Sequence, residues 1–102
     1  MDLTDFLRQW TPDRLRAHFG ERVYARGLKY QEEHNVGAIL TTEKDLLQAV
    51  VFGNRNYVVE FYRQDGQWMM VCDCPYELPC KHMVAVLLEG GLGGDAGEGE
   101  KG

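Results

Sequence analysis

The sequence predicts one small α+β domain, in which N-terminal helices precede an antiparallel β-meander and a C-terminal helix closes the fold. In the first third of the chain, apolar residues recur with the period of an α-helix. In the middle, four short segments rich in aromatic and β-branched residues are separated by clusters of turn-forming residues. With 102 residues, the chain is long enough for one domain of this kind.

Three helices are expected in the first third of the chain. The first follows a capping Asp2 and has apolar residues at the spacing i, i+3, i+4 and i+7, namely Leu3, Phe6, Leu7 and Trp10. The second begins at Thr11 and Pro12, because threonine caps a helix and proline fits its first turn, and it ends at Gly20. The third runs over residues 21–34.

The middle of the chain predicts four strands, at residues 36–41, 46–52, 57–62 and 68–74. Between the last two, Asp65-Gly66 is typical of a two-residue type I′ hairpin, because glycine adopts a positive φ without strain. Since all the connections are short, we expect successive strands to pair in one antiparallel sheet. The apolar run Met83–Leu88 predicts the closing helix, which is expected to end at Gly90.

Residues 1–88 are expected to fold, and residues 89–102 to form a flexible, glycine-rich, acidic tail or linker. These last fourteen residues contain seven glycines, four acidic residues and one lysine, and Leu92 is their only large apolar residue. Such a segment buries too little apolar surface to offset the entropy that it loses on ordering. A folded part of about 88 residues often needs an additional stabilising element.

Composition and missing motifs exclude several function classes. The sequence has no serine, which removes the Ser-His-Asp triad, and no glycine-rich phosphate-binding loop. The first twenty residues are too charged for a signal peptide, and the longest apolar run is too short to span a membrane. We therefore expect a cytoplasmic protein with no membrane association and no small-molecule substrate. Its three cysteines, an odd number, fit that reducing compartment.

The most specific chemical signal is the motif C-x-C-x5-C-x-H, which brings four side chains into eleven residues: Cys72, Cys74, Cys80 and His82. Three sulfur donors and one nitrogen donor suit tetrahedral Zn²⁺. The first two cysteines share one face of the predicted strand. Pro79 suits the start of a helix, whose first turn would then carry the other two ligands. The sequence thus predicts a zinc knuckle between the sheet and the closing helix.

Other interpretations of the motif explain it less completely than zinc does. A disulfide leaves one sulfur unpaired, and a Cys80–His82 nucleophile pair leaves two cysteines unexplained. A Cys3His iron–sulfur centre stays an alternative, since such a set can hold a [2Fe–2S] cluster. In a zinc site, Asp73 or Glu77 is a candidate to accept a hydrogen bond from the second nitrogen of His82. No enzyme is expected, because four such ligands fill the shell of the metal.

The chain resembles the SWIM zinc finger, a C-x-C…C-x-H module of SWI2/SNF2-type ATPases, MuDR-like transposases and a kinase family. Cys74-Pro75-Tyr76 and Pro79-Cys80-Lys81-His82 are similar to the bacterial versions, and so is the upstream segment Arg26–Tyr30. The resemblance covers roughly residues 20–88. It implies a β-meander, a zinc knuckle and a helix that bind DNA or protein, as an accessory domain of a bacterial SNF2-type ATPase.

The charge distribution leaves two kinds of partner open. The net charge is −5, but the segment from Arg8 to Lys29 has six basic and two acidic residues. On the third helix, Arg22, Arg26 and Lys29 are spaced i, i+4 and i+7, so they share one side. With Lys81, they are the candidate surface for nucleic acid or a protein partner. The alternative is a protein–protein adaptor that does not bind nucleic acid.

Overall fold

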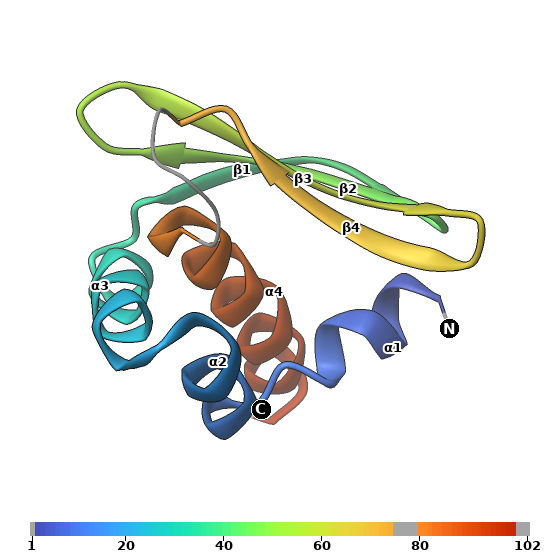
Figure 1. Ribbon diagram of the computed structural model, residues 1–102, viewed down its shortest axis with the longest axis horizontal. Coiled ribbons are helices and arrows are strands. Elements are labelled where there is room, and N and C mark those ends of the chain that lie inside the picture. The colour runs from blue at the N-terminus through green and yellow to red at the C-terminus, as the bar shows by residue number, and fades with distance from the viewer. Residues whose placement is uncertain (1, 75–79, 100–102) are drawn as a thin grey trace.

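The order of the elements is the predicted one. The computed structural model describes residues 2–74 and 80–99. It contains α1 (Leu3–Arg8), α2 (Pro12–Phe19), α3 (Glu21–Glu32), β1 (Val36–Glu43), β2 (Leu46–Phe52), β3 (Asn56–Gln64), β4 (Gln67–Cys72) and α4 (Lys81–Gly99). The strands form one antiparallel sheet in the order β1-β2-β3-β4 (Figure 1). The predicted fold class, an α+β domain with a meander, is confirmed.

The first two helices begin where the capping residues predicted. The side chain of Asp2 accepts a hydrogen bond from the Asp5 amide at 2.9 Å, and Thr11 accepts one from the Arg14 amide at 3.2 Å. Gly20, at φ +92°, then separates α2 from α3. The third helix ends at Glu32 rather than at His34, because His34 adopts a left-handed backbone conformation with φ +61°.

Five of the eight strand ends differ from the prediction by one or two residues. β3 begins one residue earlier and ends two residues later, and β4 begins one residue earlier. β1 continues to Glu43, so that only residues 44 and 45 form the first turn. β4 ends at Cys72, although the sequence predicted a strand as far as Cys74. The last hairpin is the predicted one, because Asp65 and Gly66 have φ values of +54° and +80°.

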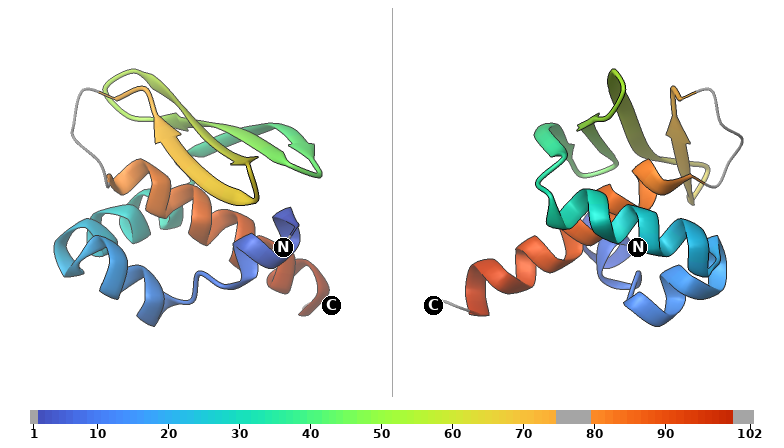
Figure 2. Two further views of the ribbon diagram at one scale, coloured as in Figure 1. Left: turned by 45° about the vertical axis from the view of Figure 1, so that its right-hand side comes forward. Right: turned by 90° about the vertical axis from the view of Figure 1, so that its left-hand side faces the viewer.

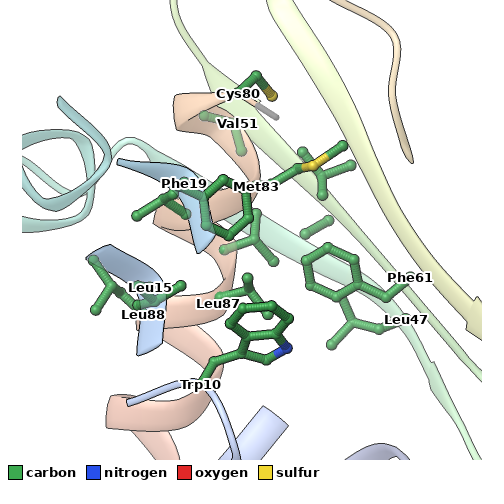
Figure 3. Packing of buried hydrophobic residues seen from close by; sticks show 14 of the residues in the cluster. Trp10, Leu15, Phe19, Leu47, Val51, Phe61, Cys80, Met83, Leu87 and Leu88 are labelled. Atoms are coloured by element: carbon green, nitrogen blue, oxygen red, sulfur yellow. The ribbon is translucent and has the colours of Figure 1, made fainter. Parts of the chain in front are cut away.

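The helices all lie on one face of the sheet, and α4 runs directly beneath it (Figures 1 and 2). Six consecutive residues of α4, from Met83 to Leu88, are buried, since the helix has the sheet on one side and other helices on the other. Alternate residues of β2 and β3 face α4, including Leu47, Val51 and Phe61. Figure 3 shows this layer together with Trp10, which lies between α1 and α2, and with Leu15 and Phe19 of α2.

The closing helix is longer than predicted. It passes Gly90, where the sequence predicted its end, and continues to Gly99. The buried residues of its first part nucleate the helix, and further turns then form one hydrogen bond at a time without a nucleation cost. The proposal that residues 89–102 form a flexible tail stays a prediction.

We expect hydrogen exchange to divide α4 into two parts. Six of the ten residues from Gly90 to Gly99 are glycines, and each destabilises a helix by about 1 kcal/mol relative to alanine. The amides of residues 92–99 should therefore exchange much faster than those of residues 84–88, whose side chains are buried. Equal protection along the whole helix would contradict the flexible tail.

Candidate metal centre

The four residues of the C-x-C-x5-C-x-H motif lie together in the fold. Cys72 is the last residue of β4, Cys74 follows two residues later, Cys80 directly precedes α4, and His82 is in its first turn. One donor atom from each side chain can be chosen so that all four lie within 4.8 Å of one another. The end of an edge strand and the start of the central helix thus converge on one point.

The donor atoms have nearly the spacing of a zinc coordination shell. The Nδ1 atom of His82 lies 3.7 Å from the Cys72 Sγ and 3.9 Å from the Cys80 Sγ. Tetrahedral zinc with Zn–S bonds of about 2.3 Å places its sulfur ligands about 3.8 Å apart. Cys80 and His82 are only 4% and 1% exposed, whereas Cys72 and Cys74 are half-buried. The residues therefore fit a zinc ion, with Nδ1 as the imidazole donor.

A hydrogen bond joins the thiols of Cys72 and Cys80 and moves their pKa values in opposite directions. A hydrogen bond from Cys72 lowers the pKa of the Cys80 thiol to about 4, and backbone amides at the start of α4 assist. The same hydrogen bond, with burial, raises the pKa of Cys72 far above its usual range. The thiolate of Cys80 is thus favoured by its surroundings, and a bound divalent cation would favour the thiolate of Cys72 as well.

The match to a known family covers the part of the chain that carries these ligands. Residues 71–91 match the SWIM zinc finger. The comparisons with curated proteins and with solved structures found no match. The SWIM match begins at the end of β4 and extends into α4, whereas the resemblance seen in the sequence covered roughly residues 20–88.

The SWIM match and the Cys3His cluster together point to bound zinc. The predicted cofactor is therefore confirmed. SWIM is a zinc-finger interaction module, not a catalytic family, and this supports a zinc-binding module for DNA or protein interaction. In the part of the chain that the structure describes, no helix has the length and apolar character needed to cross a membrane.

Two tyrosines fix the plane of the His82 ring. The Tyr57 ring stacks on the imidazole, with centroids 4.2 Å apart and an interplanar angle of 24°. Tyr30 contacts it edge-on at 5.5 Å. Sequence reasoning assigned neither tyrosine to the site, because both lie far from the motif along the chain. For Tyr57 the only signal was the pattern of its strand, whereas Tyr30 also belongs to the segment Arg26–Tyr30 that resembles bacterial SWIM proteins.

The predicted hydrogen-bond partner of the second imidazole nitrogen is not Asp73. The Nε2 atom of His82 is buried and has no hydrogen-bond partner among the described residues. The carboxylate of Asp73 instead accepts a hydrogen bond from the Val58 amide at 2.9 Å, because the chain bends after Cys72 and turns this side chain toward β3. Glu77, the other candidate, lies outside the described residues.

The four residues of the predicted basic surface lie on α3 and at the start of α4. Arg22, Arg26 and Lys29 are exposed on α3, and within the described residues none of them forms an ion pair. Lys81 is half-buried at the start of α4, and its Nζ lies 4.9 Å from the centre of the Tyr30 ring. Lys81 therefore lies beside α3, with its ammonium group over an aromatic ring.

Proposed function

We propose that this chain is a zinc-stabilised interaction module in which Cys72, Cys74, Cys80 and His82 hold one Zn²⁺. The observation that carries the proposal is the convergence of four donor atoms within 4.8 Å at the junction of β4 and α4. Four such donors fill the tetrahedral shell of zinc, as in structural sites, and leave no open position for a catalytic water. The ion then joins the edge of the sheet to the central helix.

We propose DNA as the partner, bound through the exposed side of α3. Arg22, Arg26 and Lys29 project from one side of this helix and have no acidic partner among the described residues. Three unpaired cations within two turns can contact successive phosphates. The resemblance to bacterial SWIM domains further supports a role as an accessory domain of a cytoplasmic SNF2-type ATPase.

A second candidate function, a protein–protein adaptor, is favoured by the outer face of the sheet. Phe52, Val58 and Met69 alternate with residues that pack into the core, so they point away from the helices. Each is at least 38% exposed, and in the views of Figures 1 and 2 no helix covers this face. Exposed apolar patches of this kind are typical of protein-binding surfaces.

Reversing the basic charges of α3 is expected to weaken DNA binding and to flatten its salt dependence. The triple variant Arg22→Glu, Arg26→Glu, Lys29→Glu should keep the fold, because exposed charges contribute little to stability. Each lost phosphate contact removes about 0.9 from the slope of log K against log salt, so the slope should fall by about 2.7. Fluorescence anisotropy with a labelled duplex, at two salt concentrations, measures both quantities.

A charge-matched pair of single variants controls for the change in net charge. Arg26→Glu changes the proposed surface, whereas Lys44→Glu makes the same change at an exposed lysine in the β1–β2 turn. Only Arg26→Glu should lower the DNA affinity measurably. If the parent shows no salt-dependent DNA binding, or if both variants weaken it equally, α3 is not a DNA-binding surface and the adaptor becomes the better interpretation.

A further inference from the structure

Arg55, in the turn between β2 and β3, contacts the chain between two of the metal ligands. Its Nη2 donates a hydrogen bond of 2.8 Å to the carbonyl oxygen of Asp73, and its Nη1 lies 3.9 Å from the Asp73 carboxylate. Asp73 separates Cys72 from Cys74. The guanidinium therefore holds both the backbone and the side chain of Asp73, where the chain bends between Cys72 and Cys74.

The same bend is anchored to β3 from a second direction. The Asp73 amide donates to the Val58 carbonyl at 3.2 Å, and the Val58 amide donates to the Asp73 carboxylate at 2.9 Å. β4 ends at Cys72, so the sheet ladder itself does not extend to Cys74. Beyond the last strand residue, the contacts of Asp73 with Arg55 and Val58 hold the chain in place. These contacts explain how Cys74 still lies within the cluster.

Arg55 also begins a stack that ends on the histidine ligand. Its guanidinium lies 4.6 Å from the centre of the Tyr57 ring, and Tyr57 stacks in turn on His82 at 4.2 Å. Tyr57 is buried, whereas Arg55 is exposed. Histidine ligands are usually oriented by a hydrogen bond from the nitrogen that does not bind the metal. Within the described residues, Nε2 of His82 has no such bond, so ring stacking orients the imidazole instead.

We propose that Arg55 and Tyr57 are positioning residues of the metal centre. Arg55 holds the Cys72–Cys74 bend through Asp73, and Tyr57 holds the plane of His82. This inference rests on the proposed ligation of zinc by the Cys3His set. Arginine suits this position because its planar guanidinium can donate hydrogen bonds to two acceptors and stack on an aromatic ring at the same time.

The test compares zinc retention by the full chain and its variants. Zinc-loaded protein is mixed with a chromophoric chelator, which gives the affinity by competition and the release rate. Arg55→Ala and Tyr57→Leu should weaken zinc binding about 10–100-fold, as is typical when outer-shell partners are lost. Tyr57→Phe keeps the ring and should restore retention. Arg55→Lys should restore little of it, because a single ammonium cannot replace the fork.

Arg63 provides the matched control. It lies on β3, pairs with Asp45 and places its guanidinium over the Trp68 ring at 5.9 Å, the same kind of contact at the other end of the sheet. Arg63→Ala should leave zinc affinity unchanged. Cobalt substitution adds a spectroscopic readout: the ligand-field bands of the Co²⁺ form should shift in Arg55→Ala and Tyr57→Leu but not in Arg63→Ala.

The outcomes separate this inference from the proposed function. If the parent binds one zinc and both Arg55→Ala and Tyr57→Leu retain it like Arg63→Ala, the positioning role is overturned and the ligand assignment stands. A parent that holds no zinc overturns the proposed function itself. If Tyr57→Leu fails to fold, the Arg55→Ala variant alone tests the proposal. Arg55 is exposed, so its truncation leaves no cavity in the core. Unchanged zinc affinity and cobalt bands in Arg55→Ala would then reject the proposal.

Discussion

Removing the zinc ion or one of its ligands is expected to loosen residues 68–88 first, while the rest of the domain keeps part of its structure. A structural zinc contributes about 10–16 kcal/mol of apparent binding free energy in small peptides, whereas a whole domain is stable by only about 5–15 kcal/mol. Loss of the ion should therefore lower the stability greatly. Collapse should still be partial, because the N-terminal helices and strands β1 to β3 contain none of the four residues of the Cys3His cluster.

The variant Cys74→Ala tests this expectation directly. Its thermal unfolding should begin at a lower temperature than that of the parent, and hydrogen exchange should rise first at residues 68–74 and 80–88. A chelator should lower the melting temperature of the parent and have little further effect on the variant. Met69→Ala, at an exposed position of β4, is the control and should melt like the parent.

Metal analysis of the parent completes the test. We expect one zinc ion per chain. Because protons compete with the metal for thiolate and imidazole, the stabilisation by zinc should be lost as the pH falls. A brown protein with iron and acid-labile sulfide would contradict the zinc assignment and favour the Cys3His iron–sulfur alternative. A Cys74→Ala variant that melts like the parent, with or without chelator, would show that the metal does not stabilise the fold.

Those parts of the fold that depend on neighbours in the sequence could be predicted. Helix caps, the Asp65-Gly66 hairpin and the alternation of the strands follow local rules that act over two to four residues. The four candidate metal ligands could be proposed for the same reason, since all of them lie within eleven residues of the chain.

The support around the metal centre could not be predicted, because it depends on how distant segments align. Arg55 and Tyr57 reach the site only through the register of β3 against β4, in which Val59 lies opposite Cys72. That register also turns Asp73 toward Val58 and away from His82. The sequence places Asp73 next to two ligands, and from proximity alone a contact with the histidine was the natural expectation.

The C-terminal ends of α3 and α4 differ from the prediction, whereas the positions of these helices do not. His34 leaves α3 because its backbone adopts a positive φ, which nothing in its own side chain requires. The end of α4 depends on the balance between the gain from continuing a nucleated helix and the cost of each glycine. The apolar periodicity that located the helices contains no information on the φ angle of His34 or on the energetic balance at the end of α4.

Two glycine-to-alanine substitutions are expected to change the stability in opposite directions. Gly27 is buried where α3 crosses α4, and a Cβ atom there would lie 2.9 Å from the Lys81 carbonyl oxygen and closer still to the Val84 side chain. Val84 is fully buried and branched at the atom that would be hit, so it cannot rotate away. The two helices would have to separate.

Overpacking of this kind costs about 1–3 kcal/mol, against a gain of about 1 kcal/mol in helix propensity. Because the obstacle includes backbone, we expect Gly27→Ala to lose about 2 kcal/mol of unfolding free energy. At Gly90, by contrast, the nearest atoms to an added Cβ belong to Leu7 at 3.5 Å, an ordinary contact. Gly90→Ala should therefore gain about 1 kcal/mol.

Denaturant unfolding of the zinc-loaded variants measures both free energies, and each variant is the control for the other. A Gly27→Ala protein as stable as the parent would show that α3 can move away from α4 at little cost. Because Tyr30 from α3 contacts both Lys81 and His82, the same separation should also disturb the metal centre. Gly27→Ala is therefore expected to release zinc faster than Gly90→Ala, which links the packing of the two helices to the retention of the metal.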